Sequence, residues 1–590
     1  MDQRNLILAI VLSVAILLGF QLLIAPSQVE EARQQAQTTG EPAPSKAPSS
    51  PGATNVPAPP TDIATPGTEA PGVQARADVL AKTPRVRIET PTLSGSISLV
   101  GARIDDLTLT QYRKTLDPES DQIVLLSPNG SENPYFADFG WTSAHRDVPV
   151  PGASSLWRAD RDVLAPDQPV TLSWDNGQGL RFETRLEVDS QYLFTVTQRV
   201  VNGSDKAAAL LPYGLISRTG TPKTLGYYIL HEGLLGVLGG TLKEVKYKDL
   251  KDDGAVQLPS TGGWLGITDK YWLVALVPDQ EQPVNARFLY DAKAGVDKYQ
   301  ADFLYGDITV DSGAVAERTS RLFAGAKVVN LLDSYRDDLG IARFDLAIDF
   351  GWFYFLTKPL FYALHYIAGV VGNFGVAILI LTVGVKLLFF PLANKSYTAM
   401  AKMRKLQPEM VRLREQFKDD KQRLNQEMMG LYRKEGANPM SGCLPIVVQI
   451  PVFFSLYKVM FVTIEMRHAP FFGWIQDLSA PDPTSIFNGF GLLPWAVPSL
   501  GPLDVVHLGV WPLVMGLTMF MQQRLNPQPP DPVQAKIFLF MPIIFTFLLA
   551  RFPAGLVIYW TWNNLLSILQ QYVIMRRAGV TIGRKKAAST

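Results

Sequence analysis

Lys386 is the residue whose type and position in this sequence most strongly suggest a functional site. It lies in an otherwise apolar stretch, residues 376–392, that approaches the length needed to cross a membrane. A lysine ammonium at the centre of a spanning helix costs about 2.5–3.5 kcal/mol on insertion scales, so such residues usually face a protein interior or a water-filled cavity. The alternative is a lysine near the cytoplasmic end, whose long stem carries the ammonium to the lipid headgroups.

Uncharged polar side chains accompany Lys386 in the predicted spans. Thr382 lies one helical turn before it, and Phe389 and Phe390 continue the same face. The other spans contribute Gln449, Ser455, Thr518, Thr546, Tyr559, Thr561, Asn563 and Asn564. Because these spans contain no acidic residue, the ammonium needs water, hydroxyls, amides or an incoming substrate as partners. We therefore predict a hydrated, positively charged cavity, although hydrogen bonds between helices explain most of the amides and hydroxyls individually.

The sequence around these spans divides into two parts that suit different solvents. Its 590 residues have a formal net charge of +1 and 18% charged residues, values that an ordinary soluble protein could share. Residues 85–335 read as a soluble domain, whereas residues 352–575 contain long apolar runs separated by charged connections. The single cysteine, Cys443, allows no intrachain disulfide and argues against redox chemistry.

The amino-terminal part predicts an anchor, a linker and a β domain. Residues 1–25 contain Arg4 followed by an apolar run from Leu6 to Ala25, and we interpret them as an uncleaved transmembrane anchor, with a cleaved signal peptide as the alternative. Residues 26–82 are rich in proline and alanine and predict a disordered linker. Residues 83–335 alternate apolar and polar side chains between turn residues, which predicts a large all-β sandwich. Its sequence shows no metal-ligand cluster, nucleophile elbow or phosphate-binding loop.

The carboxy-terminal part predicts an α-helical bundle of five clustered spans, so the fold class is a membrane protein that also carries the anchor and the β domain. An amphipathic helix lying in the membrane interface is expected at residues 345–370. The spans are expected at residues 371–392, 443–464, 505–521, 537–550 and 555–574. Their connections are a helical hairpin at 393–442, a loop at 465–504 and a short loop at 522–536, and a basic tail follows at 575–590.

Loop charges predict the orientation of the bundle. The hairpin contains eleven Lys and Arg residues and the tail adds five more, so both face the cytoplasm by the positive-inside rule. The loop at 465–504 has Arg467 as its only Lys or Arg and therefore faces outward, as does the β domain. Both chain ends are then cytoplasmic. Lys458, a second lysine in a span, lies nearer the outer surface, where we expect it to reach the headgroups.

Apolar side chains recur through the hairpin at helical spacing. The residues that follow this pattern are Met403, Leu406, Met410, Leu413, Phe417, Leu424, Met428 and Leu431. They predict two antiparallel helices, the second of them capped by Asp419 or Asp420. The methionines suit either an adaptable surface for apolar segments or an ordinary seam between helices, and the basic residues could hold anionic lipid headgroups.

Short motifs over about the last 240 residues resemble those of one family. They include Tyr397-Thr398, Leu406-Gln407-Pro408, Asn438-Pro439, Gly442-Cys443, Gln449-x-Pro451, Trp474-Ile475-x-Asp477-Leu478-Ser479, Phe540-Met541-Pro542 and Phe552-Pro553-x-Gly555-Leu556. This pattern resembles the YidC/Oxa/Alb family of membrane protein insertases, and the anchor with its outward β domain resembles the Gram-negative form. The resemblance implies a periplasmic β-supersandwich similar to sugar-mutarotase folds, and a location in the bacterial inner membrane.

The resemblance also implies a substrate groove. In this family one positive charge in the second span lines a hydrophilic groove and receives the polar part of a substrate. The common family residue is arginine, and Lys386 occupies its position, keeping the charge but losing the bidentate hydrogen bonding. We therefore expect the groove to contain Lys386, Thr382, Phe389, Phe390, Gln449, Ile450, Tyr559, Trp560 and Asn564.

The implied function is that of a non-enzymatic insertase and chaperone for inner-membrane proteins, which needs no cofactor, nucleotide or metal. Its expected partners are nascent membrane proteins, the Sec translocon (SecYEG and SecDF), the ribosome, the signal recognition particle and membrane lipids. Two other classes stay open at this point. One is a secondary transporter for a small anion, although the spans show no internal repeat. The other is a tethered carbohydrate-binding module based on the β domain.

Overall fold

The computed structural model describes residues 73–577, apart from residues 144–147, 226–228, 293–294, 419, 437–443, 494, 496–506 and 527–531. The predicted anchor at 1–25, most of the predicted linker and all but the first residues of the basic tail lie outside the described residues. The last part of the linker contains a short helix, α3 (Arg76–Leu80), whose Arg76 pairs with Asp106 of the β domain. Ordered structure therefore begins before residue 83.

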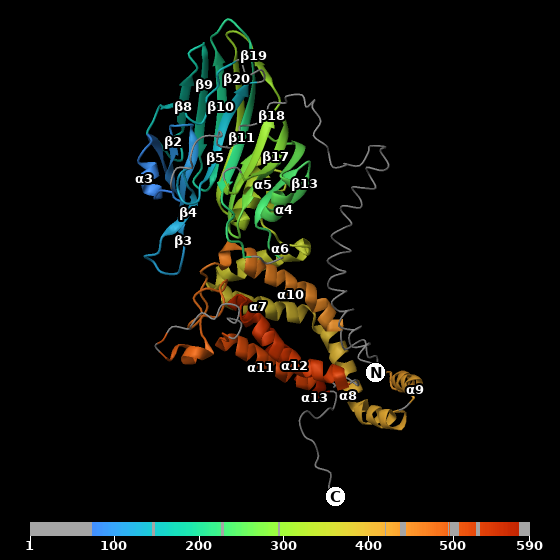
Figure 1. Ribbon diagram of the computed structural model, residues 1–590. Coiled ribbons are helices and arrows are strands. Elements are labelled where there is room, and N and C mark those ends of the chain that lie inside the picture. The colour runs from blue at the N-terminus through green and yellow to red at the C-terminus, as the bar shows by residue number, and fades with distance from the viewer. Residues whose placement is uncertain are drawn as a thin grey trace, which may run out of the picture. The chain divides into compact units, whose positions relative to one another are not determined.

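Two β-sheets pack face to face in the amino-terminal domain (Figure 1). The described strands of the first sheet follow the order β14 (Ala255–Thr261), β17 (Pro283–Asp291), β18 (Lys298–Tyr305), β11 (Ala208–Thr219), β5 (Tyr135–Ser143), β3 (Arg103–Arg113), β2 (Leu93–Ser98), β1 (Arg85–Glu89) and β7 (Val163–Leu164), with β19 (Ile308–Val310) beside β11 and β4 (Gln122–Leu126) beside β3. Those of the second follow the order β13 (Thr241–Lys246), β12 (Gly233–Leu238), β15 (Trp264–Thr268), β16 (Trp272–Val277), β20 (Val315–Ala326), β10 (Leu193–Asn202), β9 (Leu180–Val188), β8 (Val170–Asp175) and β6 (Arg158–Ala159). The predicted all-β sandwich is confirmed, with α4 (Tyr247–Asp253) as a short helical addition.

The facing sides of the two sheets form the core of this domain. Along β9, Phe182 and Leu186 are buried while Arg181 and Arg185 are exposed, which is the alternation expected of a strand with one face in the core. Polar contacts also cross between the sheets, since the Gln198 side chain of β10 donates to a backbone carbonyl of β5 at 2.7 Å. A shift of one residue would turn the buried set outward, so burial fixes the strand register.

The described residues after the β domain fold mainly into helices. They are α5 (Val329–Leu339), α6 (Tyr354–Val371), α7 (Phe374–Leu388), α8 (Phe390–Gln416), α9 (Lys421–Lys434), α10 (Leu444–Val462), α11 (Val510–Leu525), α12 (Pro532–Leu549) and α13 (Ala554–Arg577), with 3-10 helices η2 (Phe344–Ala347), η4 (Ile464–Met466) and η5 (Ile486–Gly491). Within the described part of the chain, no single helix combines the length and hydropathy of a membrane span, but α7 and α8 together do so across a bend of 68°. The number of spans therefore stays a prediction.

The bend between α7 and α8 divides the predicted second span, residues 371–392. Pro391 lies in the first turn of α8, where its missing amide hydrogen removes no hydrogen bond. The hairpin helix therefore starts before residue 393. The second hairpin helix, α9, is capped by Asp420, which accepts a hydrogen bond from the Arg423 amide at 3.0 Å, whereas Asp419 lies outside the described residues.

A buried charge network fixes α6 against α5. The ammonium of Lys358 lies 2.6 Å from Asp333 Oδ1 and 2.8 Å from Asp345 Oδ2. Arg336 also pairs with both carboxylates, and the Tyr354 hydroxyl donates to Asp345. Burial of Asp345 would raise the pKa of its carboxyl, but Lys358 and its other partners hold that pKa below its usual range. Lys358, Asp333 and Asp345 are all buried. If Lys358 is removed, the two buried carboxylates keep Arg336 as a cationic partner but lose the buried ammonium between them.

Lys458 of α10 makes a second contact with the segment before α6. Its ammonium lies 2.6 Å from Asp349 Oδ2 and also donates to the backbone carbonyls of Asp349 and Ile229. The prediction that Lys458 reaches the lipid headgroups is wrong, because its ammonium forms an ion pair with the Asp349 carboxylate.

Glu465, in η4 just after α10, meets the amino end of α5. Its Oε1 accepts a hydrogen bond from the Val329 amide at 3.3 Å, while its Oε2 is buried and has no hydrogen-bond partner among the described residues. The partial positive charge of a helix amino end favours the carboxylate. Burial nevertheless raises the pKa of Glu465 to about 7.

Replacement of Lys358 by methionine should weaken the contact between α5 and α6. Breaking a buried charge network in this way costs about 3 kcal/mol or more, because uncompensated carboxylates stay buried. The apparent unfolding temperature of the purified protein in detergent should fall clearly. Lys248→Met, at an exposed position on α4, is the matched control and should leave it unchanged. Equal unfolding temperatures for both variants would contradict the structural role of the network.

Glu465 should make stability depend on pH. The folded state binds a proton more tightly than the unfolded state, so stability falls as the pH rises from about 4.5 towards about 7 and stays lower above that value. Glu465→Gln should therefore unfold at a higher temperature than the natural protein at about pH 8, and at nearly the same temperature at about pH 5. Glu281→Gln, at an exposed position, serves as control. A wild-type-like pH profile for Glu465→Gln would exclude this assignment.

Candidate functional site

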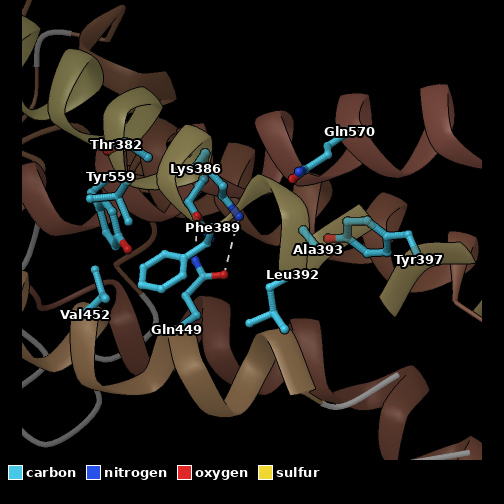
Figure 2. A pocket seen from close by; sticks show the side chains of 12 residues that line it. Thr382, Lys386, Phe389, Leu392, Ala393, Tyr397, Gln449, Val452, Tyr559 and Gln570 are labelled. Atoms are coloured by element: carbon cyan, nitrogen blue, oxygen red, sulfur yellow. Dashed lines mark hydrogen bonds between the residues drawn. The ribbon is translucent and has the colours of Figure 1, made fainter. Parts of the chain in front are cut away.

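A groove opens around Lys386 between α7, α8, α10 and α13 (Figure 2). It encloses about 540 Å³ of empty space, part of which is open to solvent. Polar and apolar side chains share its wall, which consists of Thr382, Val385, Lys386, Phe389, Leu392, Ala393, Tyr397, Gln449, Val452, Tyr559, Asn563 and Gln570. A wall of this kind offers hydrogen-bonding groups and apolar surface side by side.

Helical periodicity and the bend bring these side chains together. Thr382, Lys386 and Phe389 follow one another at spacings of four and three, so they lie on one side of α7, with Phe389 as its C-cap residue. After the bend, the first turns of α8 add Ala393 and Tyr397 to the same wall. A straight helix would continue along the axis of α7, so the bend lets the hairpin helix close one end of the groove.

Neutral groups surround the Lys386 ammonium. It donates to Ser567 Oγ at 2.8 Å and makes a longer contact of 3.4 Å with Gln449 Oε1. Figure 2 shows the Lys386 and Gln449 side chains pointing toward one another. The Gln449 amide in turn donates to Asn563 Oδ1 at 2.5 Å. Among the described residues no carboxylate forms an ion pair with Lys386, so its positive charge is solvated but not neutralised.

Contacts between neighbouring helices hold α13 in place. Asn564 donates to Thr518 Oγ1 of α11 at 3.3 Å, and the Trp562 indole donates to a backbone carbonyl of α7 at 3.2 Å. The α11 and α12 helices pack so closely at Gly516 that a Cβ atom there would lie 2.0 Å from Thr546 Oγ1. These contacts fix the side of the groove that carries Asn563.

The amino end of α11 is capped from a distant part of the chain. Gly509 precedes this helix and has no side chain, but Asp482 Oδ2 accepts a hydrogen bond from the Trp511 amide at 2.9 Å. Thr484 Oγ1 accepts from the Val510 amide at 3.0 Å. Two otherwise unpaired amides of the first turn are thereby satisfied, which stabilises the helix end.

The residues predicted for the groove occupy two kinds of place. Lys386, Thr382, Phe389, Gln449 and Tyr559 line it. The other four lie outside the lining: Phe390 and Ile450 are 43% and 45% exposed, Trp560 packs against Phe453 with ring centroids 4.5 Å apart, and Asn564 is buried against α11.

Three groove residues of α13 were not in the predicted set: Asn563 and Gln570 of the lining, and Ser567, which accepts from Lys386. With the predicted Tyr559 they recur at spacings of four, four and three, and this polar stripe would have identified α13 as a wall of the groove. The residues of α8 carry no such signal, because the direction of the bend decides whether they meet the groove.

Two family models match the chain. One, described as the YidC periplasmic domain, covers residues 85–363, and the other, described as 60Kd inner membrane protein, covers residues 366–580. Curated proteins from Methylorubrum extorquens (strain PA1) and Methylobacterium nodulans, both named membrane protein insertase YidC, are 52% and 53% identical to it. Each alignment covers 98% of this chain and 96% of the relative.

A solved structure, titled as an active YidC insertase with the first transmembrane domain resolved, is 17% identical in sequence. It matches 83% of this chain and 94% of that chain with a TM-score of 0.35. Identity above one half along almost the whole chain, together with both family models, shows the family. The chain belongs to the YidC family of inner-membrane proteins with a periplasmic domain, whose curated members are named membrane protein insertases.

Proposed function

We propose that this protein inserts other proteins into the membrane by admitting a short polar, often acidic, segment of the substrate into the groove around Lys386. The observation that carries this proposal is the Lys386 ammonium, which has hydroxyl and amide partners but no carboxylate among the described residues. A cation of this kind attracts an anionic segment, because the segment supplies the missing counter-charge.

Electrostatics gives the proposal a driving force without a cofactor. Two opposite charges 4 Å apart attract by about 4 kcal/mol at the effective dielectric constant of a partly hydrated site. Outward movement of each negative charge across the membrane potential contributes about 2.3 kcal/mol per 100 mV. Both quantities are of the size needed to bring a carboxylate partway into the bilayer, so the proposed activity is not enzymatic and uses neither nucleotide nor metal.

Exposed apolar side chains on α10 and α12 support a route for the rest of the substrate. Ile450 and Phe454 of α10 are 45% and 42% exposed, and Ile543 and Ile544 of α12 are 53% and 59% exposed. Side chains like these face lipid or another apolar helix equally well. In our proposal the apolar helix of the substrate leaves along α10 and α12 while its polar segment occupies the groove.

The partners and orientation of the protein belong to the same proposal. The positive charge of α8, α9 and the tail supports cytoplasmic chain ends. The hairpin of α8 and α9 would then meet nascent membrane proteins where they arrive, alone or beside the Sec translocon (SecYEG and SecDF). Its basic residues are suited to the ribosome, the signal recognition particle or anionic lipids.

Charge at position 386 should decide insertion. Lys386→Arg should retain activity, whereas Lys386→Glu should reduce insertion of single-span substrates with acidic leaders about tenfold or more, since about 1.4 kcal/mol corresponds to a factor of ten. Protease protection of the substrate in cells depleted of the natural protein measures this. Lys395→Glu makes the same charge change at an exposed position on α8, outside the groove lining, and should insert normally. Equal rescue by the Arg and Glu variants at position 386 would exclude the electrostatic mechanism.

Crosslinking should map the polar segment of the substrate to the groove. A photo-reactive amino acid at Val452 or Asn563, both in the lining, should label a stalled nascent chain through its polar segment. Leu565 is two residues away on α13 and 41% exposed, and the same group placed there should label that segment weakly. Equal labelling from Asn563 and Leu565 would mean that the substrate does not enter the groove.

A further inference from the structure

The segment between α10 and α11 exposes an unusual number of large apolar side chains. In the part from Phe472 to Trp495, called here the outer segment, the exposed fraction reaches 63% for Phe472, 45% for Trp474, 88% for Leu492, 41% for Leu493 and 54% for Trp495. Single exposed apolar residues are normal on a protein surface, but a concentration of them indicates a surface that contacts something apolar.

Charge is nearly absent from the outer segment. Its sequence contains no Lys or Arg and two acidic residues, Asp477 and Asp482. Both carboxylates accept hydrogen bonds, one inside the segment and one from the first turn of α11. Asp477 accepts from the Ser479 amide and hydroxyl at 2.8 and 2.7 Å, and Asp482 caps α11 as described above. A water-facing loop of this length usually carries free charges, so this composition favours an apolar surrounding.

Hydrogen bonds of the outer segment are closed within the chain. The Phe490 amide donates to the Ser485 carbonyl at 2.7 Å, and the Leu493 amide donates to the Asn488 carbonyl at 3.0 Å. The indole of Trp474 donates to Asp482 at 3.1 Å, and that of Trp495 donates to the Phe487 carbonyl at 2.9 Å. Polar groups that are satisfied internally lower the free-energy cost of entering a lipid environment.

A strained turn keeps an aromatic ring at the surface. Gly489 and Phe490 have φ values of +59° and +61°, a conformation that glycine adopts freely but that costs a phenylalanine about 1 kcal/mol or more. The Phe490 residue is 39% exposed, so a contact outside the chain would bury more of its apolar surface and help to offset this cost.

The position of the outer segment identifies the apolar surface it meets. The segment follows α10, whose end contacts α5 through Glu465 and whose Lys458 pairs with Asp349, so it lies at the side of the bundle where the β domain attaches. Asp482 ties the segment to the amino end of α11, a helix on which Val514 and Leu517 are 36% and 58% exposed. A segment tied to the end of a helix with an exposed apolar face lies at the surface of the bilayer that this face meets.

We propose that the outer segment is an interfacial anchor that lies in the membrane leaflet on the β-domain side. The occupant of its apolar surface is the bilayer itself, with the aromatic rings at headgroup level and Leu492 and Leu493 in the upper acyl region. This anchor fixes the depth of α11 in the membrane through Asp482. The inference is independent of whether the groove admits substrates.

Depth-dependent fluorescence quenching tests the anchor in the full chain. Cys443→Ser removes the only cysteine, after which Leu492→Cys accepts an environment-sensitive dye at a position where packing is least disturbed. Val315→Cys, at a 49% exposed valine of β20, is the matched control. Both proteins are reconstituted in vesicles of phosphatidylethanolamine and phosphatidylglycerol, which are prepared with and without lipids that carry a spin label near the headgroup.

The spin-labelled lipid should quench the dye at position 492 strongly. Aqueous iodide should quench the dye at 492 several-fold less than the dye at 315. Strong iodide quenching at 492 would overturn the proposal, because the segment would face water. Protection from iodide without quenching by the lipid would also overturn it, because a protein surface would then cover the segment. Thermal unfolding of each labelled variant confirms that the chain is folded during the measurement.

Discussion

The structure depends on the solvation of one positive charge by neutral groups. An ammonium inside a helical bundle needs either a carboxylate or several dipoles, and Lys386 has the hydroxyl of Ser567 and the amide of Gln449. Those groups come from α13 and α10, so the charge is stable only when these helices meet α7 at the right depth. The bonds of Asn564 to Thr518 and of Trp562 to α7 maintain that arrangement.

Other lysines of the chain show how unusual this arrangement is among its helices. Lys358 and Lys458 both pair with aspartates, at 2.6 Å in each case, and both join the helical part to the segment that leads out of the β domain. Their charges are neutralised by these structural ion pairs. Among the described residues, Lys386 has only neutral hydrogen-bond partners, and this difference from Lys358 and Lys458 is the basis of the proposed binding role.

Much of this could be predicted from the sequence, and the failures have physical causes. Strand alternation identified the β domain, because a half-buried strand repeats every two residues. The absence of acidic residues from the predicted spans identified Lys386 as a charge without a counter-ion. The contribution of Ala393 and Tyr397 could not be predicted, since it depends on the direction of a bend. Lys458 was misassigned because its partner, Asp349, is far away in the sequence and near only after folding.

The Asp482 cap fixes the amino end of α11 through a contact between residues that are distant in sequence. The carboxylate and the Trp511 amide are 29 residues apart in sequence, yet their contact sets where the helix begins. The start of α11 is therefore set by residues that lie outside the groove lining. Because Thr518 of the same helix accepts a hydrogen bond from Asn564, a contact remote from the groove also helps to position α13.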